Sequence, residues 1–310
     1  LQQYLFILLG VFIPTSIAIT NLIVGSLSLC WILEGNFKTK FEFIKASKWM
    51  LSIFGLIGLY ALGLCWGDNH LNAEWQFQRL ALLLVFPVFS TLDFKQETLK
   101  NAVTAFLITT FLSALIAIAI NTTIILPLDE YFSFLDYHWA VSAFIKYNYH
   151  NVLLALAFTM SLYILLERKT KYPSLLVLFI ITYSISIFTE IGRAGQVIFN
   201  LLSIFYIIYY NINRKYILRG LAFLLLLFSF QLIIYNSTSV YKNRFDALSN
   251  VIQNNGDRGE GKVDDIRYVF VKESLDRIIK KPILGYGTGS FGTIFNNEVK
   301  SGHVFDAHTT

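Results

Sequence analysis

Nine stretches of the chain are so rich in apolar residues that a lipid bilayer is their natural surroundings. Only 15% of the 310 residues are charged, whereas soluble domains carry about 25%. A membrane-spanning helix needs about 20 residues, so the first, second and fourth stretches are candidates for tilted, broken or re-entrant segments. The sequence predicts an all-α, polytopic membrane helix bundle with about nine passes over residues 1–235. The stretches cover about 4–16, 21–33, 49–64, 80–92, 102–126, 151–166, 174–188, 197–210 and 218–235.

Basic residues are divided unevenly among the loops between these stretches. Twelve Lys and Arg lie in or beside the loops that follow the second, fourth, sixth and eighth stretches. The alternate loops before residue 235 hold only Arg79, Lys146 and Arg193. Because cytoplasmic loops carry the excess of positive charge, we predict that residues 236–310 form a large extracytoplasmic loop. The chain starts at Leu1 and ends two residues after His308, and we expect further membrane helices beyond its C-terminal end.

The charge distribution and the cysteine content argue against nucleic-acid binding, a disulfide framework and a zinc site. The net charge of +5 comes from short basic clusters between apolar runs, which indicates membrane topology rather than nucleic-acid binding. The two cysteines, Cys30 and Cys65, lie in apolar surroundings without CxxC spacing, so neither a disulfide framework nor a zinc site is predicted. We expect no metal and no cofactor.

The polar segment 264–308 predicts an amphipathic helix followed by a glycine-rich turn. Two aspartates open the helix and a Lys-Lys-Pro sequence ends it at residues 280–282, in agreement with the preferences of helix ends. A helix of about sixteen residues is roughly 24 Å long. Its apolar stripe can lie on the bilayer surface or pack on the spans, and both alternatives stay open. The stripe consists of Tyr268, Val271, Leu275, Ile278 and Ile279.

This segment resembles the large extracytoplasmic loop of the O-antigen ligase and O-antigen polymerase superfamily. The matching elements are Arg267, the sequence PILGYGTGSF at 282–291, and Ala-His-Thr at 307–309, within about 45 residues. Members of that family are membrane glycosyltransferases that use polyprenyl-diphosphate-linked glycans without nucleotide or metal. The resemblance implies a bacterial inner-membrane enzyme of lipopolysaccharide or surface polysaccharide biosynthesis, whose long loop faces the periplasm. It also implies an undecaprenyl diphosphate donor and an acceptor that is either lipid A-core oligosaccharide or a lipid-linked glycan.

Two arginines are candidate catalytic residues that would hold the diphosphate. Arg193 lies in a polar turn between two apolar stretches, where the family carries a similar Ser/Gly-Arg-Gly/Ala turn. Arg267 lies in the first turn of the predicted amphipathic helix. A guanidinium binds phosphate oxygens in a bidentate manner and stays charged. The structural alternatives are a snorkelling Arg193 paired with Glu190 and a surface Arg267 paired with a neighbouring aspartate.

His308 is the candidate general base. An imidazole titrates near pH 6.5 and can accept a hydroxyl proton without a metal. The resemblance favours His308, because Ala-His-Thr matches the family's Ala-His-Asn/Ser/Thr element, and His303 is its competitor. The alternative for His308 is an ordinary surface histidine.

Six residues are candidates for substrate binding: His303, which also competes with His308, and five others that each have a structural alternative. Arg79 opens the fourth stretch and can contact the lipid diphosphate or act as an interfacial anchor beside an aromatic belt. Arg244 can meet lipid phosphate or belong to a solvated surface. In the turn, Gly285, Tyr286 and Gly287 can contact substrate, although a simple bend back toward the membrane is the stronger interpretation. The Gly-Tyr-Gly sequence is only weak support for an ion filter or a nucleotide loop.

Four functions remain open at this point. Ligase-like transfer to lipid A-core leads, and a polymerase that joins lipid-linked repeats is the alternative within the same class. A transporter of lipid-linked sugars is the alternative of another class, but coupled transporters usually carry ionisable residues inside the membrane. The predicted stretches hold no Asp, Glu, Lys or Arg at their centres and no internal repeat. A non-catalytic scaffold explains the amphipathic helix but not the arginines and histidine.

Overall fold

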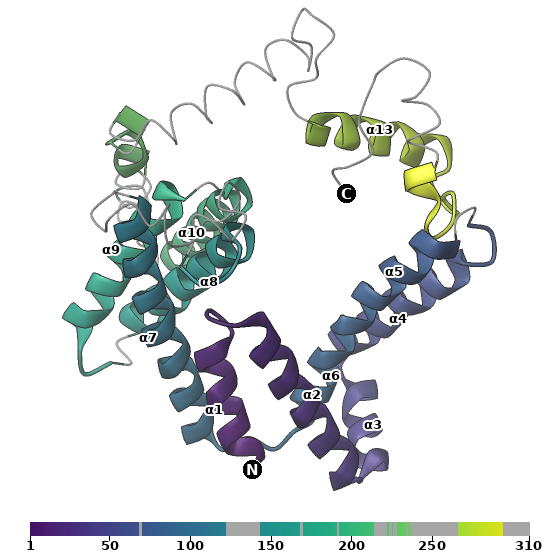
Figure 1. Cartoon of the computed structure of the whole chain (residues 1–310), viewed down its shortest axis with the longest axis horizontal. Helices are drawn as coiled ribbons and strands as arrows, with labels where there is room; N and C mark the ends of the chain where they lie inside the picture. The colour runs from purple at the N-terminus through teal and green to yellow at the C-terminus, as the bar shows by residue number, and fades with distance from the viewer. Residues whose placement is uncertain are drawn as a thin grey trace, which may run out of the picture. The chain divides into compact units, whose positions relative to one another are not determined.

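The computed structural model describes residues 1–67, 70–121, 143–167, 170–190, 192–213 and 266–293, with positions 222, 225, 228–233, 235 and 236. All regular secondary structure among these residues is helical (Figure 1), which confirms the all-α prediction for the described part of the chain. The chain divides into two compact units, Leu1–Leu27 with Phe94–Phe245, and Ser28–Asp93 with Asp246–Thr310. The predicted boundary at residue 235 concerns membrane topology rather than compactness, and it stays a prediction.

Several helices are candidate membrane spans. Among the described residues, three qualify alone by length and composition: α2 (Ile17–Glu34), most of α7 (Gln96–Asn121) and α8 (Tyr147–Leu166). The pair α3 (Phe37–Ala46) and α4 (Lys48–Gly63) is a fourth candidate if it is one broken span, because the two helices are bent by 95°. These helices indicate a multi-pass membrane protein, while the nine passes stay a prediction. Shorter apolar helices are α1 (Gln2–Phe12), α9 (Pro173–Thr189) and part of α10 (Arg193–Asn213).

The first unit is a bundle built from α1, α7, α8, α9 and α10. Helix α1 packs along α7, and α8 packs against both α9 and α10 (Figure 1). The Tyr183 hydroxyl donates to the Leu107 carbonyl at 2.6 Å and joins α9 to α7. Aromatic and aliphatic side chains fill the space between these helices, which fixes the ends of α8, α9 and α10 relative to one another. The largest of them include Phe106, Leu154, Phe158, Phe179, Tyr183, Ile187, Phe188 and Phe199.

The second unit contains the end of α2, followed by α3, α4, α5 (His70–Ala81), η1 (Leu82–Leu84), α6 (Val85–Ser90) and α13 (Ile266–Lys280). Trp31 Nε1 donates to Thr91 Oγ1 at 2.7 Å and joins α2 to the residue after α6. The turn after α13 is attached to the end of α4, because the Thr288 N–H donates to the Gly63 carbonyl at 2.9 Å. Residues 266–280 of the predicted amphipathic segment form the helix α13. The glycine-rich turn after this helix packs on the end of α4, which is part of a candidate span.

One part of this unit agrees with the prediction and another differs from it. The stretch 80–92 is divided among the end of α5, η1 and α6, which agrees with its interpretation as a broken segment. Pro87 has no N–H to donate to Leu83, so the helix tightens to 3-10 geometry just before it. The lysine-rich segment 37–46, which we expected to be a loop, is the helix α3.

Candidate functional site

Arg193 is the first residue of α10, directly after the turn that leaves α9. The first backbone N–H groups of a helix have no partner within it, and together with the helix dipole they favour an anion at this end. The predicted anion-binding arginine therefore begins a helix whose own end favours negative charge.

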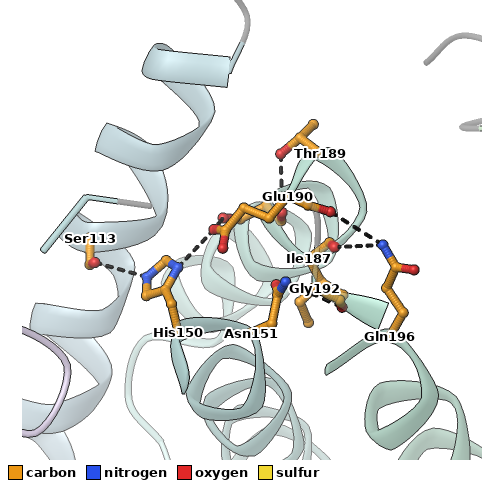
Figure 2. Close-up of polar contacts among 9 residues, drawn as sticks. Ser113, His150, Asn151, Ile187, Thr189, Glu190, Gly192 and Gln196 are labelled. Carbon is orange, nitrogen blue, oxygen red and sulfur yellow. Dashed lines mark hydrogen bonds and ion pairs between the residues drawn. The ribbon is translucent and has the colours of Figure 1, made fainter. Parts of the chain in front are cut away.

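A chain of buried polar side chains supports this turn from the neighbouring helices (Figure 2). Ser113 Oγ of α7 lies 2.8 Å from His150 Nε2 of α8. The other ring nitrogen, His150 Nδ1, lies 2.7 Å from Glu190 Oε1 at the end of α9. Ser186 Oγ donates to the same carboxylate oxygen at 3.0 Å. The chain of contacts thus connects α7, α8 and α9 just before Arg193.

Asn151 holds the other side of the turn. Its Nδ2 donates to the Gly192 carbonyl at 3.3 Å. A Cβ atom added to Gly192 or Gly195 would collide with the Asn151 side chain, so only glycine allows α10 to approach α8 this closely. Gln196 Nε2 donates to the carbonyls of Ile187 and Glu190 at 3.3 and 3.4 Å. The start of α10 is therefore fixed against both α8 and the end of α9.

The electrostatics of this cluster depend on Glu190. Burial raises the pKa of its carboxyl, and the hydrogen bond and charge of His150, with the hydrogen bond of Ser186, lower it in part. Glu190 Oε2 and Asn151 Oδ1 are buried and have no hydrogen-bond partner in the described part of the chain. The His150–Glu190 contact is therefore a buried polar link between α8 and the end of α9.

The order of serine, histidine and carboxylate is that of a nucleophile, a base and the group that orients the base. However, Ser113 and His150 are completely buried, and a nucleophile must reach its substrate. We therefore interpret the Ser113–His150–Glu190 chain as a support for the turn rather than as a nucleophilic triad.

The other predicted catalytic residues lie elsewhere. Arg267 is the second residue of α13 and belongs to the second compact unit, whereas Arg193 belongs to the first. Their convergence on one diphosphate stays a prediction. The candidates Arg244, His303 and His308 lie outside the described residues.

Arg79 and the glycine turn have local contacts within the second unit. The Arg79 guanidinium carbon lies 3.3 Å from the centroid of the Trp75 ring on the same helix, a cation–π contact that fits the interfacial anchor. Gly285 and Gly287 adopt positive φ angles of 61° and 89°, which favour glycine. Lys281 Nζ lies 4.4 Å from the centre of the Tyr286 ring. The turn bends the chain back onto the end of α4.

No group of three or more His, Cys, Asp or Glu that could hold a metal ion occurs among the described residues. The chain matches no protein-family model, no curated protein and no solved structure. Its candidate site is therefore judged on its own chemistry.

Sequence reasoning missed His150, Ser113 and Asn151, and it treated Glu190 only as a local partner of Arg193. A usable signal was present in the fifth apolar stretch. There Thr110 and Ser113 place two hydroxyls one helical turn apart, and polar residues inside apolar helices usually face other helices.

Proposed function

We propose that the chain is a membrane-embedded glycosyltransferase similar to O-antigen ligases. It would transfer a glycan from undecaprenyl diphosphate to a hydroxyl of lipid A-core oligosaccharide, in the bacterial inner membrane, with its long loop in the periplasm. The observation that carries the proposal is the position of Arg193 at the start of α10. Helix N-termini bind phosphate groups through free N–H donors and the helix dipole, and a guanidinium adds a bidentate donor.

The proposed reaction needs charge neutralisation and positioning more than covalent help. His308 takes the proton of the acceptor hydroxyl, and the acceptor oxygen forms a bond to the anomeric carbon. The bond from this carbon to the diphosphate oxygen breaks, and the lipid diphosphate leaves with the electron pair. Arg193 and Arg267 stabilise the charge that develops on the leaving group. Because the donor is already activated, no nucleotide is consumed.

The substrate-binding candidates fit around this centre in the proposal. Arg79 and Arg244 would contact lipid phosphate at headgroup level, while Gly285, Tyr286, Gly287 and His303 would contact the glycan. The cation–π contact between Arg79 and Trp75 supports a headgroup-level location, because such aromatic side chains favour the membrane interface. An O-antigen or exopolysaccharide polymerase, with a second lipid-linked repeat as acceptor, remains the alternative within this class.

A second candidate function, a transporter of lipid-linked sugars, is favoured by one observation. The buried His150–Glu190 pair lies at the adjoining ends of α8 and α9, and ionisable pairs within membrane bundles often serve proton relays. The pair lies just outside the predicted stretches 151–166 and 174–188, so the centres of the spans still hold no Asp, Glu, Lys or Arg.

One reconstitution experiment separates these functions. The full chain is placed in proteoliposomes with a defined undecaprenyl-diphosphate glycan and either lipid A-core or a second lipid-linked repeat. A glycan on lipid A-core supports the ligase, and a longer lipid-linked glycan supports the polymerase. Movement of unaltered donor across the bilayer supports the transporter. His308→Ala should abolish glycan transfer while the protein stays inserted, and unchanged transfer would refute the assignment of His308 as base.

A further inference from the structure

Helix α13 presents its apolar stripe outward. Val271, Leu275, Ile278 and Ile279 are between 55% and 75% exposed, and the stripe continues into Ile283 and Leu284 in the turn. The residues recur at helical spacing, so they form one continuous apolar surface. Contiguous apolar surfaces of this kind mark contact with another protein or with a membrane.

On the polar side of the same helix one charged side chain, that of Arg277, is buried, whereas those of Asp276 and Lys280 are exposed. Arg277 is only 6% exposed and lies on the side of α13 away from Leu275, Ile278 and Ile279, since residues 100° apart per position divide the helix in this way. A helix in water would bury its apolar stripe and expose its arginine. The outward position of the apolar stripe indicates that this surface meets a non-aqueous environment.

The attachment of the stripe indicates which environment this is. Trp66 Nε1, just after α4, donates to the Leu284 carbonyl at 3.2 Å, and Thr288 Oγ1 donates to the Tyr60 carbonyl of α4 at 2.7 Å. The apolar surface therefore adjoins the end of a candidate span. Trp66 and Trp75, which both belong to this unit, are exposed. Tryptophan is enriched at the boundary between lipid and water.

The opposite end of α4 also adjoins a helix with exposed aromatic side chains and one buried lysine. Helix α3 is bent by 95° from α4 and exposes Phe41 and Phe43. Its Lys40 is buried, with Nζ 3.0 Å from Glu34 Oε2 and 4.7 Å from the centre of the Trp31 ring. The sixteen residues of α4 give a helix about 24 Å long, slightly less than the ~30 Å of a hydrocarbon core.

We propose that α13 lies in the plane of the membrane, with its apolar stripe inserted at the boundary between phospholipid headgroups and acyl chains. The occupant of this surface is the lipid bilayer itself. Lys280 and Lys281, both exposed at the end of the helix, then lie at the level of the headgroup phosphates, which attract their positive charges. This assignment does not depend on glycan transfer.

Two adjacent residues of α13 provide a matched test. The full chain, with Cys30→Ser and Cys65→Ser, carries one nitroxide at Ile279→Cys or at Lys280→Cys in phospholipid nanodiscs. Electron paramagnetic resonance then measures the collision of the label with oxygen, which concentrates in lipid, and with a water-soluble nickel chelate. The expected oxygen-to-nickel ratio is several-fold higher at position 279 than at position 280, because the two side chains point to different sides of the helix.

Three other outcomes would overturn the assignment. Labels at both positions that meet mainly the nickel chelate would place the surface in water. A label at 279 that meets neither reagent would show that protein covers the stripe, either another part of this chain or a second copy. Equal ratios at the two positions would remove the distinction between the faces. The pair Leu275→Cys and Asp276→Cys repeats the comparison one turn earlier if the first pair fails to insert.

Discussion

The imidazole Nδ1 of His150 lies 2.7 Å from Oε1 of Glu190, and both side chains are completely shielded from solvent. The two residues are 40 positions apart in the sequence and come from α8 and the end of α9. Glu190 lies three residues before Arg193. Any change that moves the His150–Glu190 pair therefore also moves the start of α10, where the candidate anion site lies.

The first prediction concerns the strength of this pair. We expect His150→Ala to lower the free energy of unfolding by about 1 to 3 kcal/mol, because it leaves buried polar groups without a partner. In a double-mutant cycle with Glu190→Gln, the two losses should not add, and the coupling should be at least about 0.5 kcal/mol. Thermal unfolding in detergent measures all four proteins.

Thr110→Val and Ser113→Ala form the matched control for this cycle. Both remove one buried hydroxyl from α7, but Ser113 contacts His150 at 2.8 Å, whereas Thr110 Oγ1 has no partner in the described residues. Only Ser113→Ala should couple to His150→Ala. Independent, additive losses for His150→Ala and Glu190→Gln would contradict the pairing.

The second prediction follows from the raised pKa of Glu190, which is caused mainly by burial. A carboxyl whose pKa is higher in the folded protein contributes stability below its unfolded pKa of about 4.3 and loses it as the pH rises through the folded value. The unfolding temperature of the native protein should therefore fall relative to that of Glu190→Gln as the pH rises above about 4.3. A constant difference between the two proteins across this range would rule out the shift.

Local sequence was sufficient to locate individual helices. The stretches 151–166 and 174–188 correspond closely to α8 (Tyr147–Leu166) and α9 (Pro173–Thr189), because each long apolar run is bounded by charged or turn-forming residues. The segment 37–46 was misjudged because its lysines suggested a solvated loop. In the structure Lys40 turns inward to Glu34, a pairing that the spacing of residues within the segment does not reveal.

The polar chain behind Arg193 could not be predicted in the same way. His150 lies one residue before a predicted stretch and Glu190 two residues after another, so each resembled ordinary loop polarity. Their contact exists only because α8 packs against α9, which is a property of tertiary structure rather than of local periodicity. The proposed reaction also depends on Arg267 and His308, whose roles come from a resemblance and stay predictions.

The third prediction tests the close approach of α8 and α10. A Cβ atom at Gly195 would lie 2.7 Å from the Asn151 carbonyl carbon, so the backbones must separate. We expect Gly195→Ala to destabilise the protein by about 1 to 3 kcal/mol. Gly58→Ala on α4 meets no atom within 4 Å and should cause no loss. Equal unfolding temperatures for the two variants would show that α8 and α10 do not meet at Gly195.

The fourth prediction tests the attachment of the turn to α4. Thr288→Val removes the hydroxyl bond to the Tyr60 carbonyl, at 2.7 Å, and keeps the shape of the side chain. Because one buried hydrogen bond contributes about 1 kcal/mol, exchange of the Thr288 amide with deuterated water should become several-fold faster. Ser52→Ala removes an exposed hydroxyl from α4, the helix that contains Tyr60. This variant should leave the exchange rate of the Thr288 amide unchanged.

The fifth prediction concerns Arg193 itself, under the proposed transfer reaction. Arg193→Ala should lower kcat/KM for the lipid-linked donor by roughly 100-fold, the loss typical of one preorganised donor to a developing negative charge. Arg193→Lys should keep part of the activity, because lysine retains the charge but lacks the planar pair of donors that matches a phosphate.

Lys171→Ala removes one exposed positive charge from a loop predicted to be cytoplasmic and should leave transfer unchanged. Steady-state kinetics with increasing donor concentration measure these effects. If Arg193→Ala, Arg193→Lys and the native protein use the donor equally well, the guanidinium at the start of α10 does not hold the diphosphate.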